Sequence, residues 1–278
     1  MATKDESAAQ TEEQLKHQIQ ALREKLEAAQ IASQTALTSP PTTSSTHFLL
    51  LLSDSALPLG SFAFSSGLES YLSHGPRGTT SFASFLPSSL STYASTSLPF
   101  VLAAHREPKR LAELDDQLDA AVVCTVGRRA SVAQGRALLS IWERSFRATV
   151  SPGAETAVLK EYSALLRSCS SDEIPVASAH LAPLFGAVCS VMGLSLRQTA
   201  YVFMLGHVKA LVSAAVRASM FGPFQAQKVL ASENVPRWID MLIKREWSTP
   251  VEEAGQTVPV MDLWIGRHEV LYSRIFNS

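Results

Sequence analysis

Apolar residues recur at intervals of three and four along nearly the whole chain from residue 47 onward. The stretches 82–106, 111–146 and 199–221 show this spacing most clearly. It places apolar side chains on one face of an α-helix. Strict alternation over the length of a strand does not occur, and neither do the Asn-Gly and Asp-Gly pairs that mark hairpins. The sequence therefore predicts an all-α protein.

Glycine and proline divide this helical pattern into segments. With breaks near residues 75, 108, 152, 175, 222, 236 and 250, we expect about eight to ten helices. The chain has 278 residues, 46% of them hydrophobic, which is enough to form one large core. We therefore expect a single helical domain over residues 47–278.

Residues 1–46 differ in composition from the rest of the chain. Five apolar residues there alternate at spacings of four and three, as at the a and d positions of a coiled coil: Leu15, Ile19, Leu22, Leu26 and Ala29. The pattern lasts about two heptads, fewer than a coiled coil needs, so the alternative is a solvated, partly helical tail. A Ser/Thr/Pro-rich linker follows. We expect an N-terminal extension over 1–46.

The run from 174 to 196 carries no charged residue and is long enough to cross a bilayer. Pro175, His180 and Pro183 interrupt it, and no aromatic belt flanks it. A helix buried on all sides in a helical core has the same composition. We expect a buried helix here and no membrane span.

The overall composition excludes some partners and compartments. A formal net charge of -1 and a pI of about 6.7 argue against nucleic-acid binding, which needs a basic surface. The three cysteines are far apart and odd in number, which is typical of a reducing compartment. The polar, acidic N-terminus does not resemble a secretory signal. We expect a cytoplasmic protein.

No catalytic or cofactor motif stands out. No glycine precedes a lysine, so a phosphate-binding P-loop is excluded. The segment that begins at His268 has Tyr272 where a zinc-protease helix has its second histidine. Ser195 lacks the second glycine of a nucleophile elbow. We expect no cofactor, no tight metal site and no catalysis.

Residues 53–70, SDSALPLGSFAFSSGLES, are nonetheless unusually specific. Ser61 is a candidate N-cap, since serine accepts hydrogen bonds from free N–H groups at a helix start. Phe62, Phe64 and Leu68 would then bury one helix face, and Gly67 would let another helix approach. The simpler alternative is a joint between core helices with Glu69 on a solvated face.

Four motifs of this sequence resemble the UreF family of urease accessory proteins, over residues 48–278. They are ALPLGSFAFSSGLES at 56–70, GRRASVAQGRALLSIW at 127–142, the helical region 180–230, and PVMDLWIGRHEVLYSRIFNS at 259–278. The chain departs from the family pattern at Ser61, Phe64 and Ile275. Residues 1–46 have no counterpart in the family core.

The resemblance implies an all-helical homodimer that is not an enzyme. Family members bridge a nickel-carrying GTPase, UreG, and a UreD/UreH-type scaffold on apo-urease, and so regulate GTP hydrolysis and nickel insertion. Because the 160–222 region carries few charges, we expect it to form the dimer interface. Partner-binding residues are then expected within the motifs: Pro58, Gly60, Phe62, Gly67, Glu69, Arg217, Gln225, His268, Glu269, Arg274 and Phe276.

The alternative hypothesis is a helical-domain enzyme. Its site would be assembled from five residues: Glu69, His180, His207, Arg217 and His268. Convergence of these groups in one pocket with shifted pKa values would favour the enzyme. Their spread over an exposed face beside apolar patches would favour the adaptor.

The last 32 residues, 247–278, are expected to be a mobile segment, a loop followed by a helix. As a helix, 261–278 has two apolar stripes with a few polar heads, which suits a groove on a partner. The alternative is a helix docked on its own domain. The resemblance favours partner recruitment, with His268 and Arg274 at its centre. Deleting 261–278 would then abolish binding and leave stability nearly unchanged.

Overall fold

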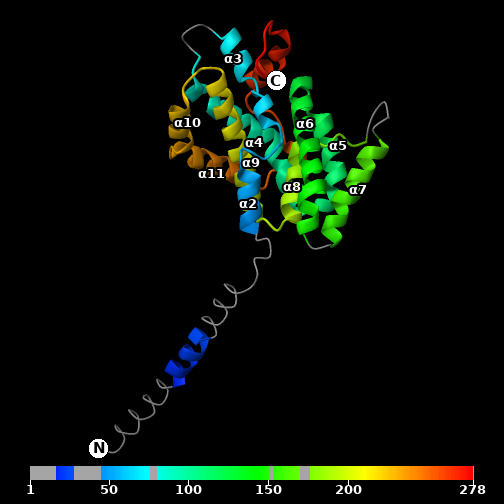
Figure 1. Ribbon diagram of the computed structural model, residues 1–278, viewed down its shortest axis with the longest axis vertical. Helices are drawn as coiled ribbons and strands as arrows, with labels where there is room; N and C mark the ends of the chain where they lie inside the picture. The colour runs from blue at the N-terminus through cyan, green and yellow to red at the C-terminus, as the bar shows by residue number, and fades with distance from the viewer. Residues whose placement is uncertain (1–16, 28–44, 76–79, 151–152, 170–175, 278) are drawn as a thin grey trace, which may run out of the picture. The chain divides into compact units, whose positions relative to one another are not determined.

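The computed structural model describes residues 17–27, 45–75, 80–150, 153–169 and 176–277 (Figure 1). Residues 17–27 form a helix in the first of two units, Met1–Ser44. The seam residues Ile19, Leu22 and Leu26 are exposed on it. Leu15 and Ala29 lie outside the described residues, so the choice between coiled coil and solvated tail stays a prediction. The domain boundary at 46 also stays a prediction.

The second unit, Ser45–Ser278, contains the other helices. Their bounds are α2 Ser45–Ser53, α3 Leu68–His74, α4 Phe82–Arg106, α5 Leu111–Ala121, α6 Thr125–Ile141, α7 Ala154–Ser168, α8 Leu181–Val191, α9 Leu196–Arg217, α10 Pro223–Leu230, α11 Asn234–Glu246 and α12 Val260–Gly266. Short 3-10 turns and one π-helical turn, Trp142–Phe146, join them. The described residues contain no strand, and the all-α prediction is confirmed.

Helices α4 and α8 form the centre of the domain. α4 packs against α8, α9 and α11, while α6 packs against α8. α5, α6 and α7 therefore lie on one side of the core and α10 and α11 on the other (Figure 1). In α8 only Leu181 and Ser190 are partly exposed. The α8 part of the uncharged run, Leu181–Val191, is thus a buried helix as predicted, whereas Val176, Gly193 and Ser195 of the same run are exposed.

Local signals in the sequence account for several helix ends. The Ser195 hydroxyl accepts a hydrogen bond from the Gln198 N–H at 3.2 Å, and the Gln198 amide oxygen accepts one from the Ser195 N–H at 2.9 Å. This is a capping box, and it begins α9. Ser81 caps α4 in the same way through the Ser84 N–H. Both serines satisfy N–H groups that a helix start leaves free.

One described helix, α9, has the length and hydropathy needed to cross a membrane. Buried core helices pass the same test, and 61% of its most apolar window is buried within the structure. α9 packs against α4, α8, α10 and α11. Packing within the domain therefore accounts for its apolar character.

The contact between α4 and α8 depends on Gly186. A Cβ atom there would lie 2.2 Å from the Val101 carbonyl oxygen and 3.1 Å from the His105 nitrogen. Gly186→Ala should lower the free energy of unfolding by about 1–3 kcal/mol, because two buried backbones would have to separate. Urea unfolding measures this loss.

Gly206 provides the matched control for Gly186. It lies inside α9 with nothing within 4 Å of its would-be Cβ. Gly206→Ala should therefore leave stability unchanged or raise it by about 0.5–1 kcal/mol. Equal urea midpoints for the two variants would mean that α4 and α8 are not in close contact.

Candidate functional site

The stretch from Pro58 to Glu69 wraps the start of α3, and the structure corrects two expectations there. Gly60 has a left-handed backbone with φ of +73°, and a 3-10 turn over Ser61–Ala63 follows it. Ser61 is not an N-cap, because its hydroxyl donates to the Gln134 side-chain oxygen at 2.8 Å. Phe62 is 65% exposed instead of buried. Leu68 is fully buried, as expected.

Gly67 allows another helix to approach closely, as the sequence predicts. Its φ is +86°, which favours glycine. A Cβ atom there would lie 3.0 Å from the Ile265 backbone nitrogen. The helix that approaches is α12, so Gly67 and Ile265, which are 198 positions apart in the chain, meet here.

Glu69 is the centre of the site. The prediction of a solvated Glu69 is wrong, since the residue is only 6% exposed. One carboxylate oxygen accepts a hydrogen bond from the Ile275 N–H at 2.5 Å. The other accepts from the Phe276 N–H at 3.2 Å and pairs with His268 Nε2 at 3.1 Å. A single buried carboxylate thus holds three points of the C-terminal segment.

Arg217, at the end of α9, holds the same segment from another side. Its guanidinium lies 4.3 Å from the centre of the Phe276 ring and donates to the Phe62 carbonyl oxygen. Desolvation by partial burial lowers the pKa of Arg217 below its ordinary value. The Asn277 N–H donates to the Ala63 carbonyl oxygen at 2.7 Å. The residues 58–69 and Arg217 therefore form a seat for the end of the chain.

The C-terminal segment does not form the continuous helix that the sequence predicts. α12 ends at Gly266 and a 3-10 turn ends at Val270. Beyond this turn the N–H groups of Ile275 and Phe276 bind Glu69, so they make no helical hydrogen bonds. These hydrogen bonds to a residue distant in sequence replace the helical hydrogen bonds that the local pattern predicts.

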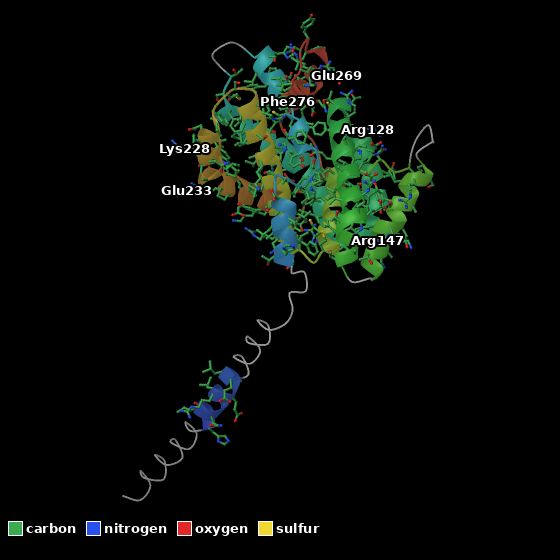
Figure 2. All side chains as sticks on the ribbon, viewed as in Figure 1. Arg128, Arg147, Lys228, Glu233, Glu269 and Phe276 are labelled. Carbon is green, nitrogen blue, oxygen red and sulfur yellow. The ribbon has the colours of Figure 1, made fainter. Side chains whose placement is uncertain are left out.

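The predicted partner-binding residues fall into two groups. Gly67, Glu69, His268 and Phe276 are buried or covered by α12, and Figure 2 shows Phe276 and Glu269 at the end of the domain near α3. His268 therefore cannot present a hydrogen bond to a partner in this arrangement. The residues Pro58, Phe62, Arg217, Gln225, Glu269 and Arg274 remain exposed, and Gly60, the eleventh, is half-buried.

The exposed charges of the segment are partly neutralised. Glu269 forms ion pairs with Arg129 and Arg274. The hydrogen bond from Arg129 lowers the pKa of Glu269 below its usual range. Arg274 also donates to the Glu269 carbonyl oxygen at 2.7 Å. Gln225 lies on α10, away from the seat (Figure 1).

The five residues of the enzyme hypothesis do not converge. Glu69 and His268 pair with each other, whereas His180 pairs with Asp119 at 2.7 Å. His207 pairs with Ser89 at 2.9 Å and stacks on the Tyr93 ring at 3.9 Å. An active site assembled from these five side chains is therefore wrong. In the described part of the chain, no cluster of three or more His, Cys, Asp or Glu side chains could hold a metal ion.

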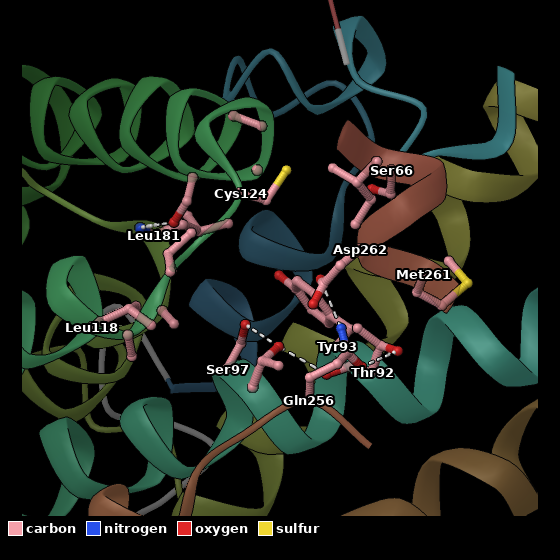
Figure 3. Close-up of a pocket in the computed structure, with 18 of the residues that line it drawn as sticks. Ser66, Thr92, Tyr93, Ser97, Leu118, Cys124, Leu181, Gln256, Met261 and Asp262 are labelled. Carbon is pink, nitrogen blue, oxygen red and sulfur yellow. Dashed lines mark hydrogen bonds between the residues drawn. The ribbon is translucent and has the colours of Figure 1, made fainter. Parts of the chain in front are cut away.

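A cavity of about 350 Å³ lies beside the seat and was not predicted from the sequence (Figure 3). α4, α6 and α12 each contribute to its wall. The Gln256 side chain accepts from Thr92 at 2.9 Å and donates to Asp262 at 2.8 Å across one side. Met261, Asp262 and Ile265 line it, so the C-terminal segment forms part of the cavity wall.

His207 also lines this cavity, and it makes stability depend on pH. Burial lowers the pKa of His207 from 6.5 to about 3. Below pH 6.5 the unfolded chain therefore binds a proton that the folded chain does not, so stability falls as the pH falls towards 3. The slope from this residue is about 1.4 kcal/mol per pH unit.

A His207→Gln variant should lack this component. Relative to pH 7, the wild-type chain should lose about 2–3 kcal/mol more than the variant by pH 4.5. Urea unfolding at the two pH values measures the difference. An equal acid loss in both proteins would show that His207 titrates normally.

The fold and this site define an all-helical protein whose most specific residues seat its own C-terminal segment. The family model for UreF matches residues 77–233. A protein from Schizosaccharomyces pombe, described as an uncharacterized urease accessory protein UreF-like, is 40% identical over 234 residues, 84% of this chain and 97% of its own length. The chain belongs to the UreF family of urease accessory proteins.

Plant and bacterial relatives extend this similarity. Urease accessory protein F of Oryza sativa subsp. japonica is 32% identical over 81% of this chain and 82% of its own length. Urease accessory protein UreF of Paenarthrobacter aurescens is 32% identical over 82% and 95%. The resemblance identified from the four motifs is thus confirmed over most of the chain.

Proposed function

We propose that this chain is a cytoplasmic adaptor that bridges a UreG-type GTPase and a UreD/UreH-type scaffold on apo-urease. In this role it regulates GTP hydrolysis and nickel insertion without catalysing a step itself. Family membership supports a role in urease maturation. The sequence has no P-loop, so the nucleotide chemistry belongs to a partner. Nickel is cargo of the assembly and not a resident cofactor of this chain.

The observation that carries the proposal is a group of exposed apolar side chains around the seat. We call this group the C-terminal face: Phe62, Leu263, Val270, Tyr272 and Ile275, each at least 61% exposed. Scattered apolar residues are normal on a surface, whereas a gathered set marks an interaction site. Glu69 fixes the backbone of Ile275. The face is therefore presented in a defined shape, and binding costs little ordering entropy.

The composition of the C-terminal face suits recognition by a protein partner. Apolar and aromatic side chains form it, and Arg267 and Arg274 lie among them in the sequence. Aromatic and arginine residues are enriched where protein interfaces gain most of their binding energy. We therefore propose that the UreD/UreH-type scaffold binds the C-terminal face. The GTPase then binds a part of the domain surface that the scaffold does not cover.

We also propose that the chain forms a homodimer, but the low charge of residues 160–222 does not identify the dimer interface. The low charge of 160–222 was expected to mark an interface. The apolar residues of α8 are instead buried inside the domain, so the core explains much of that composition. Sedimentation at micromolar concentration distinguishes a dimer from a monomer.

A bridging assay tests the function. Immobilised scaffold should retain the GTPase only when this chain is added, and Ile275→Asp should reduce retention at least tenfold. Leu50→Asp is the matched control, because Leu50 is 63% exposed and Ile275 is 61% exposed. Leu50 lies on α2, away from the C-terminal end (Figure 1). Retention of the GTPase without this chain, or equal loss in both variants, would contradict the proposal.

A further inference from the structure

Three polar side chains form a relay next to the cavity. The Ser131 hydroxyl lies 3.0 Å from His180 Nδ1, and His180 Nε2 lies 2.7 Å from an Asp119 carboxylate oxygen. Ser131 lines the cavity, and His180 behind it is fully buried. A hydroxyl, an imidazole and a carboxylate in this order are the parts of a nucleophilic triad. Of the five residues in the enzyme hypothesis, only His180 belongs to it.

The hydrogen-bond partners determine which atom of each pair in the relay donates its proton. The Leu181 N–H donates to the Ser131 oxygen at 3.3 Å, so the serine proton is free to point to His180 Nδ1. His180 then carries its own proton on Nε2 and donates it to Asp119. Arg128 holds Asp119 through two hydrogen bonds, at 2.6 and 3.0 Å. Burial opposes ionisation of Asp119, but the hydrogen bonds from Arg128 and His180 outweigh it and lower its pKa.

The backbone around His180 is held in a strained form. Ala179 has φ of +68°, which is rare for a residue with a side chain. The fully buried Asp115 carboxylate accepts hydrogen bonds from the N–H groups of Ser178, Ala179 and His180. Such strain persists only where the surroundings impose it, and it is concentrated at functional sites. The turn therefore places the imidazole accurately behind Ser131.

The cavity gives a substrate access to the serine. Leu181 and Ala182, the first residues of α8, line the cavity together with Ser131 (Figure 3). The N-terminus of a helix attracts negative charge, and the Leu181 N–H already points at the Ser131 oxygen. Among the described lining residues, Asp262 is the only one with a formal charge, since His207 is held neutral. The cavity thus favours small uncharged molecules.

We propose that Ser131 is an activated nucleophile that hydrolyses small uncharged esters in this cavity. The Ser131 oxygen attacks the ester carbonyl carbon, and its proton passes to His180 Nδ1. The C–O bond to the leaving alcohol breaks, and that alcohol takes the proton from His180. Water then attacks the acyl-serine, releases the carboxylic acid and returns the proton to Ser131. No redox partner is needed, and the activity is separate from the adaptor role.

The test uses the full chain with p-nitrophenyl acetate. We expect a burst of about one nitrophenolate per chain, with one acetyl group on the peptide that contains Ser131. Ser131→Ala should lower the burst rate at least about a hundredfold. Ser213→Ala is the matched control, because Ser213 is an exposed serine of helix α9 that does not line the cavity. This control should keep the full burst.

A second measurement starts from the wild-type chain, so its first result does not depend on how a variant folds. A fluorophosphonate probe added to the wild-type chain should label Ser131, as shown by peptide mapping. Asp119→Asn should slow labelling at least tenfold while circular dichroism shows a folded protein. Labelling spread over several serines, no labelling, or an undiminished burst in Ser131→Ala would each overturn the proposal.

Discussion

Glu69→Ala is expected to release the C-terminal segment and to abolish binding of the scaffold. The substitution leaves the N–H groups of Ile275 and Phe276 without their acceptor and His268 without its partner. Leaving a buried hydrogen-bonding group without its acceptor costs about 1–3 kcal/mol for each group. The opening free energy of this segment should fall by that amount. Amide hydrogen exchange at residues 275 and 276 should then rise at least about a hundredfold.

Two controls separate this effect from a general loss of charge. Glu69→Gln keeps one acceptor oxygen and should lose only part of the protection. Glu252→Ala removes an exposed carboxylate elsewhere and should change neither exchange nor binding. Unchanged exchange at residues 275 and 276 in Glu69→Ala would show that the segment is held without this carboxylate.

Deletion of residues 261–278 is expected to destabilise the whole domain. The sequence alone predicts almost no change in stability, and the structure reverses this expectation. Met261, His268 and Phe276 are buried in the domain, and Glu69 would lose the His268 side chain and the two backbone N–H groups that it binds. Each large apolar side chain removed from a core costs about 2–5 kcal/mol. The total loss approaches the 5–15 kcal/mol that stabilises a typical domain.

Urea unfolding and circular dichroism measure the effect of this deletion. We expect the truncated chain to be largely unfolded at 37 °C or to unfold at a far lower urea concentration. Removing residues 1–44, which form a separate unit, is the matched control and should leave the urea midpoint unchanged. A truncated chain with the wild-type midpoint would mean that the C-terminal segment is an independent appendage.

Signals that act over a few residues made the fold predictable. Helical spacing predicts α4 and α9, and the uncharged run predicts the buried α8, whereas the Ser195–Gln198 capping box that begins α9 was recognised only in the structure. Each depends on periodicity or on contacts within one turn. The sequence therefore identifies the fold class and the central helices.

The site was less predictable because its contacts are distant in sequence. Glu69 binds residues 199 to 207 positions away, and no local pattern distinguishes it from a solvated glutamate. Phe62 likewise lies in a local pattern that predicts burial, yet it is 65% exposed. The family motifs indicated that these residues matter. Their internal role in seating the chain end required the structure.

The roles of the exposed motif residues remain predictions. Pro58, Gln225 and Arg274 are accessible, and their assignment to partners depends on the family resemblance. The cavity that Cys124 and Ser131 line could not be predicted from the sequence for a different reason. The helices α4, α5, α6, α8, α9 and α12 all contribute to this cavity, so no single motif could reveal it.

Hydrogen exchange of the full chain with and without the UreD/UreH-type scaffold tests the central claim most directly. The proposal that the seated C-terminal face is the scaffold site predicts slower exchange at residues 260–277 and 60–70 on binding. It predicts no change on α7 or on α2. Protection confined to α7, α10 or α11, with the C-terminal face unchanged, would contradict it.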